Sequence, residues 1–506
     1  MSFAARLAAA RRGQADADDI ADLARLALDE GEEEQALPLV LAAASRADAA
    51  RLWQWAGLLQ RGLDAHADAI DSFAKAARLA PDDASIAHGR ARVAFEAGLD
   101  AVSLFEAAER LGPPNGDVLI GLAAARWAAG QGEAAEAALD AIVAQVPLWL
   151  QGHMQLAQLR ALMGRREAAT ASFERALAQG PGAAALWRGL LDLHLQREDH
   201  IAQAEVVARA VRAGVAEADV ADHAAIAAAE LGQADRADRL FEALPDEAMR
   251  IATRIWRVRH LLRGARFPQA GPLVDAEIEA GGARRAAIWP YALLLWRLTD
   301  DPRYAWLAGD PGLVRTFDLR GRLPPLDALA AHLRTLHVAR SEYLDQSVRG
   351  GTQTDGPLFS RIDPLTQALR AAVVGAIDAY VAALPAPDPS HPLLGGGRDR
   401  RRRFAGSWSV RLRGAGYHAN HVHPQGWISS ALYVALPEKR PGDAPEAGWL
   451  TLGEPQAALG LDLPPTRMVE PVAGRLVLFP SWMWHGTRPF VEGERLTVAF
   501  DVAPPR

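Results

Sequence analysis

The sequence contains no cysteine. This absence excludes disulfide bonds, zinc–thiolate sites, iron–sulfur clusters and cysteine nucleophiles, so a metal ion would have to be held by His, Asp or Glu. The sequence also lacks an apolar run near the roughly 18 residues that a membrane-spanning helix needs. The apolar stretch 7–10, close to the N-terminus, is too short for a signal peptide. We therefore expect a cytoplasmic protein with no membrane partner.

The sequence has no strong excess of positive charge. Its 506 residues include 55 Lys and Arg and 62 Asp and Glu, which gives a net charge of −7. Because nucleic-acid-binding domains are usually basic, we expect no nucleic-acid partner. The one basic run, 398–403, lies beside a stretch rich in Gly and Pro. This run predicts a solvated loop or the start of a strand, rather than a phosphate site.

A short motif recurs through the first half of the chain. Two apolar residues three positions apart, followed by a proline at offset eight, begin at Phe73, Phe105, Leu139 and Phe173, and the apolar pair returns without the proline at Val207. The successive shifts of 32, 34, 34 and 34 residues are typical of a helix–turn–helix unit. The motif resembles the tetratricopeptide repeat (TPR).

This resemblance implies an all-α TPR solenoid in residues 1–250, with a concave groove that binds a protein or peptide. Residues 251–345 keep a helical pattern without the repeat, and we expect a helical connecting region there. A polar, Gly-rich loop at 347–356 and an amphipathic helix at 363–384 are predicted next.

The period of the apolar pattern changes to two near Phe404. Alternating runs at 408–413, 428–435, 474–479 and 495–502 are separated by Gly and Pro. Several short strands with such punctuation predict a β-sandwich or barrel. The last domain is therefore expected to be a β domain, and we place it at residues 346–506.

Histidines gather in this β domain. His418, His421 and His423 lie close together, and His485 follows a later predicted strand. Positions two apart on a strand face the same side, so His421 and His423 can point to one place while His418 has the opposite parity. A His-x-His pair with one distant histidine gives a facial set of metal ligands with open positions. The sequence therefore predicts a metal site at His421, His423 and His485, although imidazole ligands suit iron, zinc, copper and nickel alike.

A second group of polar residues accompanies the histidines. Arg495 lies ten residues after His485, at the start of the next predicted strand, and Thr497 shares its face. A guanidinium can hold a carboxylate through two parallel hydrogen bonds, and a hydroxyl can add a third. Tyr433 and Ser429 lie on the strand after the His-x-His pair and have the parity to face the same pocket.

These features together resemble the 2-oxoglutarate (2OG) and Fe(II)-dependent oxygenases, with the double-stranded β-helix core of prolyl 4-hydroxylases. The resemblance covers about residues 346–503, and bacterial members of this group are fused to TPR repeats. The motifs that carry it, in chain order, are His421-x-His423, Ser-Ser-Ala-Leu-Tyr433-Val, the run from Gly474 through Leu-Phe-Pro to His485, and Arg495-x-Thr497.

The resemblance implies a jelly-roll or cupin-like fold with flanking helices, and Fe(II), 2OG and O2 as metal and co-substrates. His421 and His485 match the iron-binding histidines of the family. Arg495 matches the residue that binds the distal carboxylate of 2OG, and Thr497 and Tyr433 match its usual helpers. The implied reaction is hydroxylation of a substrate, coupled to conversion of 2OG to succinate and carbon dioxide.

This sequence departs from the family at His423, where an Asp or Glu is common. Either three histidines bind iron, or His423 does not bind and water takes its place. The main hypothesis is a 2OG-dependent dioxygenase, a hydroxylase, whose TPR groove recruits a protein or peptide substrate. A three-His cupin dioxygenase that does not use 2OG, and a TPR adaptor with a catalytically inactive barrel, stay open as alternatives.

Overall fold

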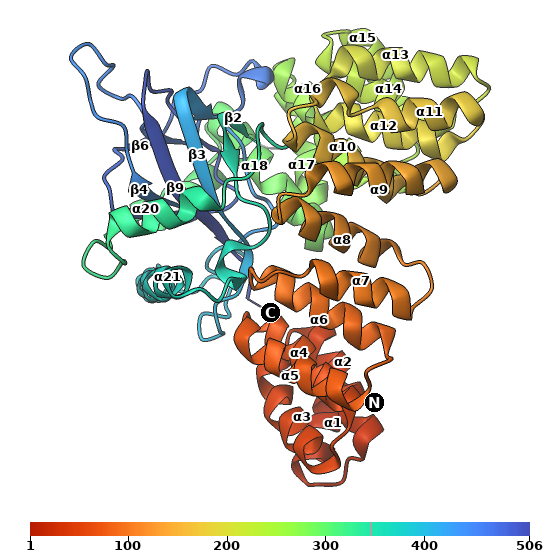
Figure 1. Cartoon of the computed structure of the whole chain (residues 1–506). Coiled ribbons are helices and arrows are strands. Elements are labelled where there is room, and N and C mark those ends of the chain that lie inside the picture. The colour runs from red at the N-terminus through yellow and green to blue at the C-terminus, as the bar shows by residue number, and fades with distance from the viewer. Residues whose placement is uncertain (345–346, 506) are drawn as a thin grey trace.

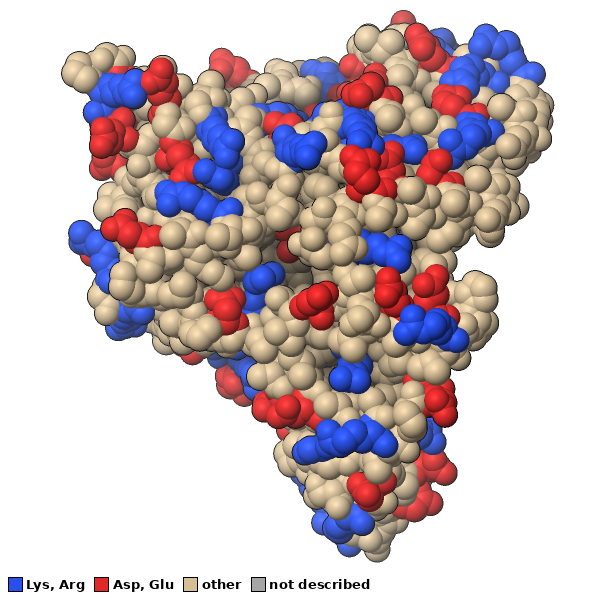
Figure 2. Space-filling model, viewed as in Figure 1, with Lys and Arg blue, Asp and Glu red and all other residues tan. Residues whose placement is uncertain are grey.

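The computed structural model describes residues 1–344 and 347–505. The helices of residues 3–243 form a curved arm, and two β-sheets lie on one side of it, as Figure 1 shows. The arm is the predicted TPR solenoid, and the sheets with their flanking helices are the predicted double-stranded β-helix. On the face seen in Figure 2, acidic and basic side chains are intermixed over both parts.

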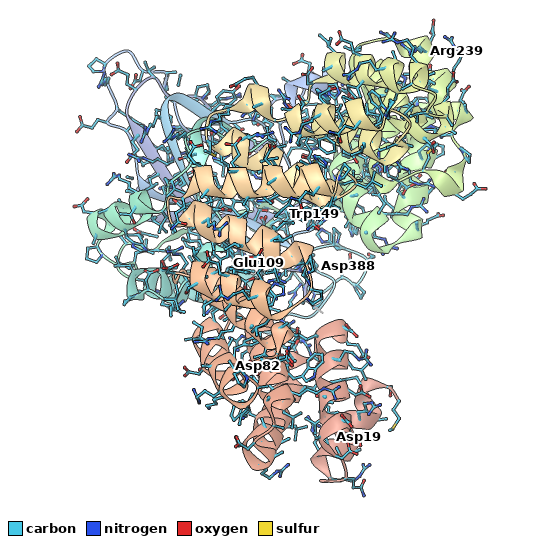
Figure 3. The ribbon with its side chains drawn as sticks, turned by 45° about the vertical axis from the view of Figure 1, so that its right-hand side comes forward. Asp19, Asp82, Glu109, Trp149, Arg239 and Asp388 are labelled. Atoms are coloured by element: carbon cyan, nitrogen blue, oxygen red, sulfur yellow. The ribbon has the colours of Figure 1, made fainter. Side chains whose placement is uncertain are left out.

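The arm consists of antiparallel helices that pack in sequence order. In Figure 3, Asp19, Asp82, Glu109, Trp149 and Arg239 follow one another along it. Its helices are α1 (Phe3–Arg11), α2 (Ala17–Glu30), α3 (Glu33–Ala47), α4 (Ala50–Gly62), α5 (His66–Leu79), α6 (Ala84–Glu96), α7 (Val102–Leu111), α8 (Gly116–Ala128), α9 (Gly132–Gln145), α10 (Leu150–Leu162), α11 (Ala171–Gln179), α12 (Ala184–Gln196), α13 (His200–Arg212), α14 (Glu217–Glu230) and α15 (Ala234–Ala243).

The repeat motif marks the second helix of each pair. Phe73, Phe105, Leu139 and Phe173 are buried on α5, α7, α9 and α11. Small residues on the facing helices make room for the rings: a Cβ added at Gly121 on α8 would lie 2.2 Å from Phe105 Cε1. Because protein interiors are close-packed, this ring fits only against a residue without a side chain. The residue that repeats in the sequence is therefore the one that each repeat buries between its helices.

The region expected to be helical, 251–345, is helical over most of its described length, but it contains one strand, and its segment 336–344 is irregular. Residues Arg315–Asp318 form strand β1, which pairs with β7 (Arg475–Pro480). The expectation is wrong at β1 because a strand this short is defined by its distant partner rather than by local pattern. The helices of the region are α16 (Ile251–Arg263), α17 (Phe267–Ala280), α18 (Gly282–Leu298), α19 (Arg303–Ala308) and α20 (Leu326–Thr335).

The larger sheet has the strand order β1-β7-β4-β9-β3-β2, and the smaller sheet has the order β6-β5-β8. All the pairings within both sheets are antiparallel. The remaining strands are β2 (Val348–Gln353), β3 (Phe404–His418), β4 (Ile428–Ala435), β5 (Leu450–Leu452), β6 (Arg467–Val469), β8 (His485–Thr487) and β9 (Glu494–Val502).

The segment expected to be a Gly-rich loop, 347–356, contains the edge strand β2. A register shift between Arg349 and Gly351 interrupts its pairing with β3. A Cβ added at Gly351 would lie 2.5 Å from the Arg411 carbonyl oxygen, so glycine permits the close approach of the two strands. The loop interpretation is wrong because these glycines serve a bulge instead of a free turn.

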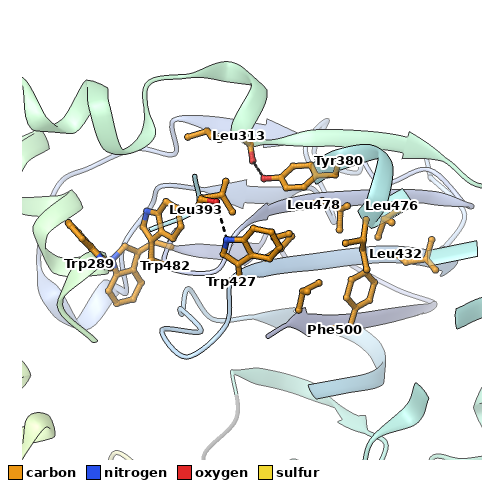
Figure 4. Packing of buried hydrophobic residues seen from close by; sticks show 14 of the residues in the cluster. Trp289, Leu313, Tyr380, Leu393, Trp427, Leu432, Leu476, Leu478, Trp482 and Phe500 are labelled. Carbon is orange, nitrogen blue, oxygen red and sulfur yellow. Dashed lines mark hydrogen bonds between the residues drawn. The ribbon is translucent and has the colours of Figure 1, made fainter. Parts of the chain in front are cut away.

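Both faces of the larger sheet are buried. On β7, Leu476 and Leu478 face a helical layer that includes α21 (Pro364–Ala382), while Val477 and Phe479 pack toward the smaller sheet. Figure 4 shows the helical side, where the Tyr380 hydroxyl donates a 2.7 Å hydrogen bond to the Leu313 carbonyl. Burial on both faces explains why residues 476–479 of β7 are all apolar.

Among the described residues, α21 is the one helix long and apolar enough to cross a membrane by length and composition. Leu369, Val373, Ile377 and Tyr380 on this helix are buried in the core shared with the sheet. In this structure α21 therefore acts as a core helix. The cytoplasmic location expected from the sequence stays a prediction.

The basic run leads directly into β3, as one of its two interpretations predicted. Asp399 and Arg401 are exposed, but the other arginines of the run are partly buried in contacts. Arg400 lies 3.2 Å from a Glu32 carboxylate oxygen and Arg403 lies 2.7 Å from Glu33, and both arginines also donate to the Gly31 carbonyl. These contacts fasten the start of β3 to the beginning of the arm.

A segment of the chain itself, 336–344, lies against the face of the arm formed by α8, α10 and α12. The Arg340 amide donates to the Leu162 carbonyl at 2.9 Å, and the Leu344 amide donates to Gln158 Oε1 at 3.2 Å. Leu344 is buried in the apolar cluster that includes Phe173. The chain therefore occupies this part of the solenoid groove with its own residues.

Gly121→Ala is expected to destabilise the protein by about 1–3 kcal/mol, because the new methyl group overlaps the Phe105 ring. The change is measured as a fall in thermal and urea midpoints. Gly271→Ala on α17 is the matched control, since no atom lies within 4 Å of its Cβ position. This control should be neutral or stabilising by up to about 1 kcal/mol, because alanine favours helix. Equal midpoints for the two variants would contradict the packing account.

Candidate metal centre and cofactor pocket

Three histidines converge between the two sheets. His421, His423 and His485 each offer a ligand atom, and these atoms lie within 4.8 Å of one another. The ring centroids of His421 and His485 are 4.2 Å apart. The structure therefore brings together the three histidines that the sequence predicted as ligands.

Convergence does not arise from a regular strand, as the sequence interpretation assumed. β3 ends at His418, and His421 forms an isolated antiparallel bridge with His485. The amide of each donates to the carbonyl of the other, at 2.9 and 3.0 Å. The His423 amide donates to the Ser481 carbonyl at 3.0 Å. Two backbone anchors on the β7–β8 segment thus position the His-x-His pair.

Each ring is oriented through its Nδ1 atom. His421 Nδ1 lies 2.8 Å from the Ala419 carbonyl oxygen, and His485 Nδ1 lies 2.9 Å from that of Met483. His423 Nδ1 contacts a carboxylate oxygen of Asp501. When Nδ1 carries the donated proton, Nε2 keeps a free lone pair, which is the form that binds a metal ion.

The protonation of His421 and His485 suits metal binding. Burial lowers the pKa of His421 and of His485 well below the usual range, and neighbouring histidines lower it further. Burial also disfavours the charged form of His423, but the Asp501 carboxylate outweighs it and raises the pKa of His423. Neutral imidazoles do not have to release a proton before they bind a metal.

His418 lies beside the cluster but outside it. Its Nδ1 is 3.2 Å from Ser347 Oγ, which is also 3.2 Å from His421 Nε2. Burial, assisted by Arg495 and His423, lowers the pKa of His418 to about 3. His418 is thus set apart from the three clustered histidines, although strand parity does not explain this, because β3 ends at His418.

Arg495 is a buried cation, with 2% of its surface exposed. Its Nη1 donates to the Gly448 carbonyl at 2.8 Å, and its Nε has no hydrogen-bond partner. The guanidinium lies over the Tyr433 ring, 5.0 Å from the centroid. Within residues 1–344 and 347–505 no carboxylate forms an ion pair with it, so a buried positive charge is left without an anion.

The other predicted cofactor residues surround this cation. Thr497 lies directly opposite Tyr433 in the register of β4 and β9. Thr497 and Arg495 line the same small cavity as the three histidines, and the buried Tyr433 hydroxyl has no hydrogen-bond partner among the described residues. Ser429 also lines the cavity, but its hydroxyl donates to Asp501 at 2.5 Å.

Asp501 is the residue that the sequence interpretation missed. It is buried, lines the small cavity and contacts His423. Arg495, Thr497 and Asp501 lie at even spacings on β9. They therefore face the same side of the strand, so the parity argument that selected Arg495 and Thr497 also applies to Asp501. That signal was present in the sequence, but a carboxylate at the end of a strand has no distinctive motif.

The small cavity, of about 50 Å³, adjoins a much larger cleft of about 880 Å³. His418, His421, His423, Ser347 and Trp408 line both. The far wall of the cleft comes from the solenoid, mainly from the turn 196–198 after α12 and from Arg166. The histidine cluster is thus reached from a space between the two domains.

Residues 406–501 match the family model described as "Putative 2OG-Fe(II) oxygenase", and residues 99–159 match a tetratricopeptide repeat model. The chain is a TPR-containing oxygenase-like protein. The oxygenase match includes all three clustered histidines, Arg495 and Asp501. No curated protein matches the chain significantly.

Solved structures similar to the TPR-containing oxygenase-like chain include proteins titled as TPR proteins and MamA. YrrB, titled a TPR protein with an unusual peptide-binding site, is 20% identical, covers 34% of this chain and 91% of its own, and has a TM-score of 0.24. MamA from Desulfovibrio magneticus RS-1 is 17% identical, with coverage of 32% and 94% and a TM-score of 0.29. A TPR protein from Parabacteroides merdae is 17% identical, with coverage of 46% and 94% and a TM-score of 0.28.

His423→Ala is expected to weaken binding of Fe(II), or of Co(II) as an oxygen-stable probe, by at least about 100-fold. Loss of a direct ligand should cost no less than loss of an outer contact, which costs up to about that factor. Anaerobic calorimetry measures the affinity. His418→Ala should leave it within a few-fold, because His418 lies outside the cluster. An unchanged affinity in His423→Ala would favour a site with two histidines and water.

Proposed function

We propose that the C-terminal domain is a 2OG- and Fe(II)-dependent oxygenase that hydroxylates its substrate. The observation that carries the proposal is Arg495, a buried guanidinium that no carboxylate of the described residues pairs with, in the same cavity as three converging histidines. An unpaired buried charge is costly, so its retention here fits a site completed by an anionic ligand. The family match supports the same conclusion.

The residues fit the metal and co-substrate by their chemistry. His421, His423 and His485 would hold Fe(II) on one face and leave its other positions open. Arg495 would bind the distal carboxylate of 2OG through its free Nε and Nη2 edge, with help from Thr497. Bound Fe(II), 2OG and O2 together supply the oxidation that converts a C–H bond to C–OH while 2OG becomes succinate and carbon dioxide.

Tyr433 and the apolar walls set the surroundings of this chemistry. The Arg495 guanidinium lies over the Tyr433 ring. This cation–π contact helps to orient the guanidinium. Val477 and Phe479 close the space between the sheets. Exclusion of water strengthens the pairing of a carboxylate with Arg495 and limits oxidation without substrate.

We infer that the substrate enters through the large cleft. The solenoid groove at α8, α10 and α12 holds the chain's own segment 336–344, so that stretch is not free for a peptide. The cleft instead presents Arg197 and Gln196 from the solenoid opposite His421 and His423. A protein or peptide segment would therefore contact the arm and the metal centre together.

Arg495→Ala is expected to weaken 2OG binding by about 100-fold, in line with about 1.5–3 kcal/mol for a hydrogen bond to a charged group, while Fe(II) still binds. The readouts are the 2OG-dependent rise in melting temperature and the weak visible absorption band of a chelated keto acid under anaerobic conditions. Arg488→Ala is the matched control, because this arginine lines the cleft but is paired with Glu454. Wild-type protein that binds Fe(II) without any response to 2OG would favour a dioxygenase that does not use 2OG.

Arg197→Glu is expected to reduce substrate hydroxylation at least about tenfold, the effect of about 1.4 kcal/mol, without changing 2OG binding. A lysate treated with enzyme, Fe(II) and 2OG would be analysed by mass spectrometry for polypeptides that gain one oxygen atom. Arg239→Glu at the far end of the arm is the control (Figure 3), since Arg239 does not line the cleft. Equal product yields from the two variants would contradict substrate entry through the cleft.

A further inference from the structure

The three clustered histidines are not equivalent. His421 and His485 direct Nδ1 to neutral backbone carbonyls of residues two positions earlier. His423 directs Nδ1 to the carboxylate of Asp501. Among the described residues that line the small cavity, Asp501 is the only carboxylate.

Asp501 is held in place by hydrogen bonds to both of its carboxylate oxygens and by close packing. It is 7% exposed, and its second carboxylate oxygen accepts the 2.5 Å hydrogen bond from Ser429, its cross-strand neighbour. Ser481 Oγ lies 3.0 Å from Ser429 Oγ. A Cβ added at Gly426 would lie 2.6 Å from Ser481 Oγ and 3.3 Å from Asp501 Cβ, so the surrounding turn packs closely. Both oxygens are therefore engaged away from the metal position.

The other side of His423 is covered by Trp408. The two rings are stacked, with centroids 5.7 Å apart and planes inclined by 26°. His423 is thus held between an aromatic face and a carboxylate. A carboxylate that accepts the Nδ1 proton makes the imidazole a more basic and more electron-rich ligand at Nε2.

We propose that Asp501 supplies, through His423, the negative charge that an Asp or Glu ligand supplies directly in the common metal triad. Three neutral histidines would leave the full double charge of Fe(II) uncompensated. The hydrogen-bonded carboxylate reduces the charge of the metal and its immediate surroundings by one, as a direct carboxylate ligand does. Asp501 is a positioning and charge-balancing residue, and His423 is the group through which it acts.

This inference rests on the metal site of the proposed function, and it does not depend on 2OG. Asp501→Asn keeps the shape and can still accept a hydrogen bond from His423, but it removes the charge. We expect it to weaken Fe(II) and Co(II) binding by about 10- to 100-fold. It should also raise the Fe(III)/Fe(II) midpoint potential, because loss of a negative charge destabilises Fe(III) more than Fe(II).

The decisive experiment repeats Asp501→Asn in a His423→Asp background. There the ligand itself carries the charge and no imidazole connects Asp501 to the metal, so removal of the second carboxylate should change metal affinity and midpoint potential much less than it does beside His423. Equal losses in both backgrounds would show a merely structural role and overturn the inference. Calorimetry with Co(II) and anaerobic redox titration with iron give the two readouts.

Ser429→Ala is a second variant that keeps the carboxylate and removes one of its supports. It should weaken metal binding less than Asp501→Asn and leave the midpoint potential nearly unchanged. A potential that shifts as far as in Asp501→Asn would contradict the assignment to charge. Wild-type protein that binds neither metal would overturn this inference and the proposed function, whereas metal binding without a response to 2OG would overturn only the latter.

Discussion

The antiparallel register of β4 and β9 is the constraint on which the whole site depends. It places Ser429 opposite Asp501 and Tyr433 opposite Thr497. The inner face of β9 then carries the polar residues, and Leu496, Val498 and Phe500 face the helical core. A shift of one residue would exchange these two sets, because successive side chains on a strand point to opposite faces. The apolar packing beneath α21 therefore also holds the polar residues in the cavity.

That face of β9 carries one buried cation and one buried carboxylate. Asp501 is fully engaged with His423 and Ser429, whereas among the residues that the structure describes Arg495 contacts a backbone carbonyl and an aromatic ring but no carboxylate. The carboxylate beside the three histidines is thus satisfied, while the guanidinium in the same cavity has no carboxylate partner among the described residues. Such an arrangement is typical of a binding site, because buried charges in a purely structural role are paired.

The solenoid forms one wall of the cleft that leads to the histidine cluster. Its first units are fastened to the start of β3 through Arg400 and Arg403, and its middle units hold the segment 336–344. Arg259 on α16 donates to Gln456 Oε1 at 2.9 Å, which supports the loop on another side of the cleft. The two domains therefore act as one unit around the cleft, and the groove of the solenoid is only partly available to other molecules.

The sequence by itself determined the elements with strong periodicity and the residues with strong chemistry. The recurrence of Phe73, Phe105 and Phe173 indicated the solenoid, since each repeat must bury the same ring. Alternation indicated β3, β4, β7 and β9, and parity selected Arg495 and Thr497. Only the tertiary structure decided β1 and β2, the bridge between His421 and His485, the self-occupied groove and the contact of Asp501 with His423. Each of these is a contact between residues far apart in the chain, and such contacts leave no local period in the sequence.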